Sequence, residues 1–210
     1  MAVQCYIEQV SNYRRRVGPV IEIRIHGRGG QGNVAAAYIL ASAAFEDSRF
    51  SQAFPSFGAE RRGAPVTAFV RIADKPFSRR CQVIHPGYLI IQDEALLHVP
   101  GVTDGLLPGG GILVNSTRSS AELKEMTGLD MIAIPANALA KKILGRPVPN
   151  TALLAAFLTL TGMVSLDALV KGLGQRFKGE VLERNTRLVN EAAKMVPVGI
   201  WKEANHAANA

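Results

Sequence analysis

The chain has 210 residues, of which 48% are hydrophobic and 20% are charged. This composition excludes an intrinsically disordered protein and is typical of one globular domain that buries its own core. Two cysteines and four scattered histidines exclude a disulfide framework. They also exclude an iron–sulfur cluster or a cysteine-rich zinc site built by this chain alone.

The net charge of +7 is distributed unevenly. Residues 1–80 contain 12 lysines and arginines against 6 acidic residues, a net charge of +6, and the rest of the chain adds only +1. A basic N-terminal part predicts an anionic partner, such as a phosphorylated ligand, an acidic protein surface or nucleic acid. A solvated basic surface explains the charge equally well. Nucleic acid is disfavoured, because we find neither a clustered basic helix nor an aromatic strand that could stack bases.

The chain reads as one domain with two appendages: an N-terminal extension (1–19), a central domain (20–196) and a C-terminal tail (197–210). The longest nearly apolar runs, 34–45 and 151–164, are shorter than the about 18 residues that a membrane-spanning helix needs. We therefore expect no membrane partner. The start of the chain has no hydrophobic stretch of the secretory type, so we expect a cytoplasmic protein.

The central domain opens with a strand, a glycine-rich loop and a helix. Residues 20–25 alternate apolar and polar side chains, which predicts a strand, and HGRGGQG at 26–32 forms the loop. Residues 33–46 carry alanine, leucine and isoleucine at helical spacing. This order is typical of the beginning of an α/β domain.

The middle of the chain predicts a long loop and then alternating short elements. Residues 51–65 hold two prolines and two glycines without a usable period, which predicts a loop of the kind that is often functional. Short helices are expected from Asp93, around 120–126 and over 135–144. The expected strands are 66–72, 88–92, 112–115 and 131–134.

The last third of the chain is predicted to be helical. Asn150 can cap a helix over 151–161, and Ser165 can cap the next one. A longer helix over 180–195 contains Asn185 in its apolar stripe, where it needs a hydrogen-bond partner if it is buried. The expected fold class is therefore α/β: an open sheet flanked by helices, with a glycine-rich loop after the first strand and a helical C-terminal third.

The glycine-rich loop matches the G-x-G-x-x-G fingerprint of dinucleotide-binding domains. In that fingerprint, glycines let the backbone approach a phosphate at a helix N-terminus. A second strand that ends in an acidic residue must follow about 20 residues later. Glu46 and Asp47 end the helix instead, and no strand-like run follows before Arg61. A free-standing NAD(P)-binding Rossmann-type oxidoreductase is therefore the alternative interpretation rather than the leading one.

Two adjacent arginines, Arg61 and Arg62, lie between glycines in the long loop. Guanidinium groups bind phosphates and carboxylates bidentately, so the pair is a candidate oxyanion site. A loop held by an ion pair from Glu60, with its arginines in water, fits the sequence equally well. We find no catalytic constellation. His26 beside the glycine loop is more typical of hydrogen-bonded packing than of a general base.

Two long motifs occur in order, HGRGGQG at 26–32 and FPSFGAERRG at 54–63. They resemble the gamma subunit of the 2-oxoacid:ferredoxin oxidoreductases, the pyruvate and 2-ketoisovalerate group. The resemblance covers roughly residues 20–196. Three shorter segments support it: Gln92-Asp93-Glu94, Pro108–Gly111 and Pro149-Asn150-Thr151.

The resemblance implies a non-catalytic subunit of a multi-subunit enzyme that oxidatively decarboxylates a 2-oxoacid to an acyl-CoA and CO2. Thiamine diphosphate and [4Fe–4S] clusters are then expected on partner subunits, with ferredoxin or another acceptor taking the electrons through the complex. The isolated chain is expected to be inactive. Pyruvate, branched-chain, 2-oxoglutarate and aryl-glyoxylate substrates all stay open.

The resemblance also implies that this subunit contacts coenzyme A, whose phosphates suit the basic first 80 residues. We expect no catalytic residue and no metal ligand in the chain. The candidate cofactor-binding residues are Gly29, Gly30, Gln31, Gly32, Arg61 and Arg62.

Overall fold

The structure is a computed structural model that describes residues 19–56, 63–79 and 81–202. Its strands are β1 (Val20–Arg28), β2 (Phe50–Ser56), β3 (Pro65–Ala73), β4 (Tyr88–Ile91), β5 (Gly111–Asn115) and β6 (Ile132–Ile134). Its helices are α2 (Asn33–Glu46), the 3-10 helix η1 (Glu94–His98), α3 (Ser120–Thr127), α4 (Ala136–Leu144), α5 (Asn150–Thr161), α6 (Leu166–Arg176) and α7 (Gly179–Ala193).

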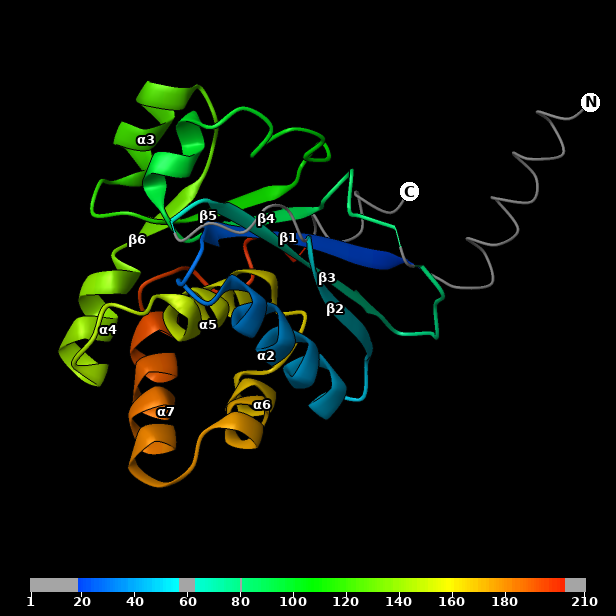
Figure 1. Cartoon of the computed structure of the whole chain (residues 1–210), viewed down its shortest axis with the longest axis vertical. Helices are drawn as coiled ribbons and strands as arrows, with labels where there is room; N and C mark the ends of the chain where they lie inside the picture. The colour runs from blue at the N-terminus through cyan, green and yellow to red at the C-terminus, as the bar shows by residue number, and fades with distance from the viewer. Residues whose placement is uncertain (1–18, 57–62, 80, 203–210) are drawn as a thin grey trace, which may run out of the picture.

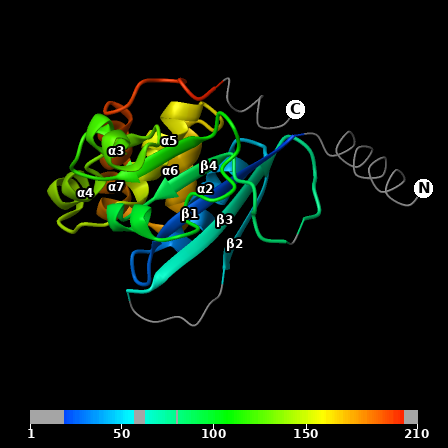
Figure 2. The same cartoon turned by 90° about the horizontal axis from the view of Figure 1, so that it is seen from above.

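The described strands form one open six-stranded sheet in the order β2-β3-β1-β4-β5-β6 (Figure 1). Strands β1, β4, β5 and β6 run parallel, whereas β3 is antiparallel to β1 and β2 is antiparallel to β3. Helices α3 and α4 lie at the opposite end of the sheet from β2 (Figure 2). The α/β prediction, with an open sheet flanked by helices and a helical C-terminal part, is confirmed.

One face of the sheet carries the main core. The isoleucines of β1 (Ile21, Ile23, Ile25) point to this face and pack with α2 and α5. Helix α6 packs on α2, and α7 packs on α5 and α4, so that these helices lie together below the sheet in Figure 1. All twelve residues of α5 are buried, which explains why its sequence is apolar on every side rather than along one stripe.

The opposite face is covered in two different ways. Over β4 and β5, η1 and α3 complete a smaller apolar cluster, with Leu96 and Leu123 at its centre. Over β1 and β3, the same face presents the charged side chains of Glu22, Arg24 and Arg71. Extended segments that precede β4 and follow η1 cover these charges, and their carbonyl groups accept hydrogen bonds from the arginines.

The predicted loop at 51–65 is wrong in its first part. Residues 51–56 belong to the edge strand β2, which pairs with β3 from Phe50↔Ala73 to Ser56↔Thr67. Pro55 in this strand is tolerated because an edge strand lacks a partner on one side. Residues 57–62 of the predicted loop lie outside the described residues. The new strand does not complete a dinucleotide fingerprint, because β2 pairs antiparallel with β3 and does not lie beside β1.

Two further predictions need correction, and one is confirmed. Strand β1 runs through the first part of the predicted glycine loop, because Gly27 and Arg28 still pair with β3. The Asn150 side chain does not cap α5 but donates a hydrogen bond to the carbonyl of Gly32. Ser165 caps α6, as predicted, by accepting from the backbone N–H of Ala168.

The polar residue in the stripe of α7 is fully satisfied. Asn185 is buried, accepts a hydrogen bond from Thr151 Oγ1 at 2.8 Å and donates one to the carbonyl of Val181 at 2.8 Å. It therefore joins α7 to α5 without an unpaired polar group. Among the described helices, none has the length and apolar content that crossing a membrane requires.

Candidate functional site

Polar loops gather where the parallel strands end. The chain segments that follow β1, β4, β5 and β6 meet at one edge of the sheet, the place where open α/β sheets commonly bind ligands. A cavity of about 280 Å³ lies between the last three of these segments and Gln31 of the glycine loop. Its lining is mainly polar: Gln31, Gln92, Asp93, Glu94, Asn115, Ser116, Thr117, Pro135, Asn137 and Ala138.

Arg28 connects segments of this edge that lie far apart in the sequence. Its Nε is 2.6 Å from Asp93 Oδ2 after β4, and its Nη1 donates to the carbonyl of Gly63 at 3.2 Å. Its backbone N–H donates to Gln31 Oε1 at 2.7 Å. Asp93 also caps η1 by accepting from the N–H of Ala95 at 3.0 Å. The glycine-rich loop, the Gln92-Asp93-Glu94 segment and the end of the second long motif are thus held together.

The glycine loop leads directly into the first turn of α2. Gly32 has a φ of +79° and precedes α2 without offering a side chain as a cap. Its carbonyl accepts hydrogen bonds from Ala36 N at 2.9 Å and from Asn150 Nδ2 at 3.0 Å. The first N–H groups of α2 have no side-chain cap among the described residues, which suits an anionic ligand.

Of the other loop residues, Gly29 is hydrogen-bonded to the β3 side of the sheet and Gly30 borders open space. Gly29 continues the pairing of β1 with β3, because its N–H donates to Ala64 O at 2.9 Å and its carbonyl accepts from Gly63 N at 3.4 Å. Gly30 has a φ of +93°, and a β-carbon built there would meet no heavy atom within 4 Å. The structure therefore places Gly29–Gly32 at the carboxyl edge, whereas Arg61 and Arg62 lie outside the described residues.

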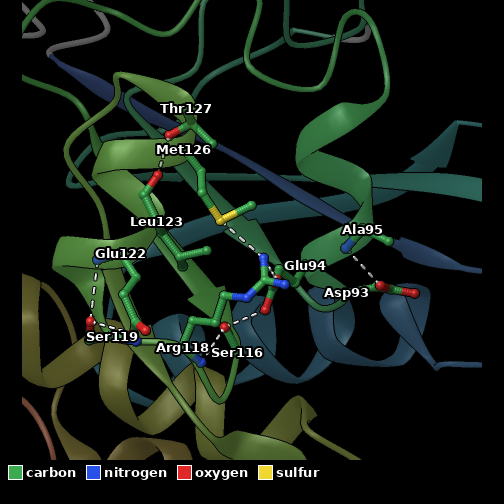
Figure 3. A network of polar contacts seen from close by, with 10 residues as sticks. All are labelled: Asp93, Glu94, Ala95, Ser116, Arg118, Ser119, Glu122, Leu123, Met126 and Thr127. Atoms are coloured by element: carbon green, nitrogen blue, oxygen red, sulfur yellow. Dashed lines mark hydrogen bonds and ion pairs between the residues drawn. The ribbon is translucent and has the colours of Figure 1, made fainter.

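A second ion pair fixes the loops after β4 and β5 (Figure 3). Arg118 Nη1 lies 2.8 Å from Glu94 Oε1, and Ser116 Oγ donates to the same carboxylate. Arg118 also reaches Met126 Sδ at 3.0 Å on α3. Asp93 and Glu94 each form an ion pair with an arginine. Their two negative charges are therefore balanced, although both side chains line the cavity.

Amide side chains complete the edge. Asn115 donates to the carbonyl of Gln92 at 2.9 Å and accepts from the N–H of Asn137 at 3.0 Å, which joins the ends of β4, β5 and β6. The Gln92 side chain is 1% exposed, and neither atom of its amide group finds a partner within the described part of the chain. It lines the cavity as a buried donor and acceptor.

The prominent histidine of the first motif faces away from this edge. His26 lines a different cavity on the open face of the sheet and contacts Thr67 Oγ1 through Nδ1 at 3.3 Å. Burial, and to a smaller extent the nearby charge of Arg24, lower the pKa of His26 to about 4. The imidazole is therefore neutral at neutral pH.

The site contacts of Arg28, Asn115 and Asn150 are not predictable from local sequence, because their partners lie 23 to 118 residues away in the chain. Their only signal is position: Arg28 lies inside the first motif, Asn115 is the last residue of a buried strand, and Asn150 lies in one of the shorter supporting segments. No group of three or more His, Cys, Asp or Glu side chains that could hold a metal occurs in residues 19–56, 63–79 and 81–202.

An open, mostly parallel sheet with a glycine loop between its first strand and a helix defines an α/β domain, a class in which ligands commonly bind at this edge. The family model described as pyruvate ferredoxin/flavodoxin oxidoreductase matches residues 22–195. The chain belongs to this family.

Curated relatives match over nearly their whole length. The pyruvate synthase subunit PorC of Methanocaldococcus jannaschii is 46% identical over 173 residues, which cover 82% of this chain and 95% of the relative. The pyruvate/ketoisovalerate oxidoreductases common subunit gamma of Pyrococcus furiosus is 42% identical over 182 residues, with coverages of 85% and 98%.

Solved structures agree with this fold. The crystal structure of pyruvate oxidoreductase subunit PORC from Thermotoga maritima has a TM-score of 0.76 and 35% identity, and the match covers 85% of this chain and 97% of that one. A chain of the 2-oxoglutarate:ferredoxin oxidoreductase from Magnetococcus marinus has a TM-score of 0.67 and 22% identity. There the match covers 85% of this chain and 31% of the other, so the same fold occurs as part of a longer chain.

The depressed pKa of His26 predicts a loss of stability in acid. Between the ordinary pKa of 6.5 and the folded-state pKa of about 4, the unfolded chain binds a proton that the folded chain does not. The free energy of unfolding should therefore fall as the pH drops through this window, by up to about 3 kcal/mol, and His26 should contribute no pH dependence above it. Denaturant unfolding at several pH values measures this.

The His26→Gln variant should lose that part of the pH dependence. The same substitution at the exposed His98 is the control and should retain it. A His26→Gln profile parallel to that of the parent protein would contradict the assignment.

The contact between Gly32 and Asn150 predicts a difference between two neighbouring glycines. Alanine at either Gly30 or Gly32 must adopt a left-handed backbone, but only at Gly32 would its β-carbon lie 2.6 Å from Asn150 Nδ2. We expect Gly32→Ala to lower the free energy of unfolding by about 1–3 kcal/mol more than Gly30→Ala does. A double-mutant cycle checks this, because Gly32→Ala should cost less in an Asn150→Ala background. Purely additive effects would show that the two residues do not touch.

Proposed function

We propose that this chain is the gamma-type subunit of a multi-subunit 2-oxoacid:ferredoxin oxidoreductase. The observation that carries the proposal is the match to proteins named as such subunits, which extends over 95% and 98% of the two relatives compared above. In this proposal thiamine diphosphate and [4Fe–4S] clusters belong to partner subunits, and the complex passes electrons to ferredoxin or another acceptor. The chain itself contributes no bond-making residue.

The proposal includes a contribution to coenzyme A binding at the carboxyl edge. When bound, coenzyme A supplies the thiol that accepts the acyl group. The residues present fit its phosphates: α2 begins without a side-chain cap, and Gly30 leaves open space beside the loop. Gly29, Gly30, Gln31 and Gly32 would line the approach to the phosphates, although the N–H groups of Gly29 and Gln31 already donate to the carbonyls of Ala64 and Arg28. Arg61 and Arg62 would supply charge.

The alternative, a free-standing NAD(P)-dependent oxidoreductase, is less well supported. A dinucleotide-binding sheet places a second parallel strand beside the first, with an acidic residue at its end to hold the ribose. Here the strand after α2 is the antiparallel edge strand β2, and the parallel neighbour of β1 is β4. Asp93, which follows β4, is already bound to Arg28 and to the start of η1.

Purification of the chain alone and of its complex from the native cell tests the subunit assignment. The purified chain should be colourless and should show no turnover with any 2-oxoacid and coenzyme A. Co-purification from the native cell should recover partner subunits, and that complex should reduce ferredoxin with one of the 2-oxoacids. Turnover by the lone chain, or a nicotinamide cofactor bound to it, would overturn the assignment.

Substitution of Arg61 and Arg62 tests the coenzyme A part. Arg→Ala at either position should raise the apparent KM for coenzyme A about ten- to hundredfold, because a charge-assisted hydrogen bond contributes about 1.5–3 kcal/mol. The KM for the 2-oxoacid should change little. Arg→Lys should recover only part of the loss, because lysine keeps the charge but not the planar fork.

The exposed Arg176 of α6 is the control, and its replacement by alanine should leave both constants unchanged. If the Arg61 and Arg62 variants instead lose complex integrity on gel filtration while coenzyme A kinetics stay normal, the arginines bind a neighbouring subunit. Normal assembly together with normal kinetics would exclude both roles.

A further inference from the structure

A second cavity lies on the open face of the sheet and shares no lining residue with the cavity at the carboxyl edge. Its volume is about 440 Å³. Arg24 and His26 are two residues apart on β1 and therefore point to the same side of the sheet. Their cross-strand neighbours on β3 are Phe69 and Thr67, which line the cavity with them. The walls come from the segments that precede β4 and follow η1.

Arg24 is a buried cation whose one acidic neighbour in the cavity lining, Asp104, forms no ion pair with it. It is 8% exposed, and its Nη2 donates to the carbonyls of Val102 at 3.0 Å and Asp104 at 2.6 Å. Its Nε has no hydrogen-bond partner within the described residues, and no carboxylate there forms an ion pair with it. Burial lowers the pKa of Arg24, partly opposed by the charge of Asp104, and the guanidinium stays charged at neutral pH.

Arg71, a second buried arginine on the same face, is paired with a carboxylate. Arg71 is fully buried, and its Nε lies 2.7 Å from Glu22 Oε1. The partly buried Arg28 and Arg49 also have carboxylate partners. A buried charge without such a partner is costly. Arg24 therefore stands out among these arginines as one that an anion from outside the chain could neutralise.

His26 offers a second free group to the same cavity. It is 6% exposed, and its Nε2 has no partner among the residues that the structure describes. When the Thr67 hydroxyl donates to Nδ1, the neutral ring carries its proton on Nε2, which then acts as a donor. Arg24 and His26 thus supply one positive charge and one neutral donor.

The other residues that line the cavity indicate which kind of anion fits it. Phe69 and Val83 are almost completely buried, and Ile84 at the cavity edge is 67% exposed. The Asp104 carboxylate also lines the cavity and opposes the double charge of a phosphate more than the single charge of a carboxylate, and the apolar walls suit a short hydrocarbon group. We propose that this cavity binds a small organic monocarboxylate, with the carboxylate between Arg24 and His26 and the apolar part against Phe69 and Val83.

Direct binding to the full chain tests the proposal without any measurement of enzyme activity. The probes are isovalerate and its uncharged amide, isovaleramide, which have nearly the same shape. Isovalerate should shift backbone NMR signals of β1 and β3 and bind measurably by calorimetry, and the amide should not. Equal binding of the two probes, or no binding of isovalerate, would overturn the proposal.

Variants then locate the site. Arg24→Gln should weaken isovalerate binding about ten- to hundredfold, as expected for the loss of a charge-assisted hydrogen bond. Thr67→Val removes the hydroxyl that orients His26 and should weaken binding several-fold. The exposed Arg176→Gln is the control and should bind as the parent chain does. Unchanged binding in Arg24→Gln would overturn the assignment.

A charge change at the cavity edge keeps the test valid if Arg24→Gln does not fold. Gln82 is exposed and lines the cavity, so its replacement should leave the fold intact. Gln82→Glu should weaken isovalerate binding and Gln82→Lys should strengthen it, each several-fold and less at high salt. If both variants bind equally, the carboxylate does not lie in this cavity. Because the test measures binding to this chain alone, its failure would leave the subunit assignment untouched.

Discussion

The alternation of side chains along β1 is the constraint on which most of this structure depends. β1 hydrogen-bonds to β3 on one side and to β4 on the other, so it sets the register of both halves of the sheet. Its isoleucines enter the core between the sheet and helices α2 and α5, while Glu22, Arg24 and His26 face the opposite side. A slip of one residue would place the charges in the apolar core, so the register is strongly determined. That register also places the glycine loop at the edge where β4, β5 and β6 end.

The sheet brings the loops after β1, β4 and β5 close together, and arginine–carboxylate pairs then hold them in place. Arg28 with Asp93, and Arg118 with Glu94, join the ends of β1, β4 and β5. The Arg28–Asp93 pair is partly buried, so solvent screens it less than the second pair, in which Arg118 is exposed. The loops at the carboxyl edge are therefore held by side chains rather than by regular structure, and an edge of this kind can present backbone donors in a fixed arrangement.

The sequence predicts the elements that carry their own periodicity and misses those that depend on distant partners. The strand–loop–helix opening and the apolar α5 are evident locally. Strand β2 is not, because FSQAFPS lacks alternation and contains a proline, and it becomes a strand only by pairing with β3. Local capping rules also fail at Asn150, whose partner is Gly32, 118 residues earlier in the sequence. For the site, the motifs locate the glycine loop, but the contacts of Arg28 and Asn115 require the strand order.

Some buried polar groups are satisfied within the fold, and others in the described part of the chain keep unbound atoms beside the two cavities. Asn185 and Arg71 are buried with their polar atoms bound, as expected where burial serves packing. Gln92 at the carboxyl edge, and Arg24 and His26 on the open face, are buried with atoms unbound among the described residues, and each lines a cavity. An unsatisfied buried donor or acceptor costs about 1–3 kcal/mol. Unbound buried atoms also occur away from both cavities within residues 19–56, 63–79 and 81–202, for example at Asn33 and Gln52. The unbound atoms therefore support the two proposed sites only together with the cavities that they line.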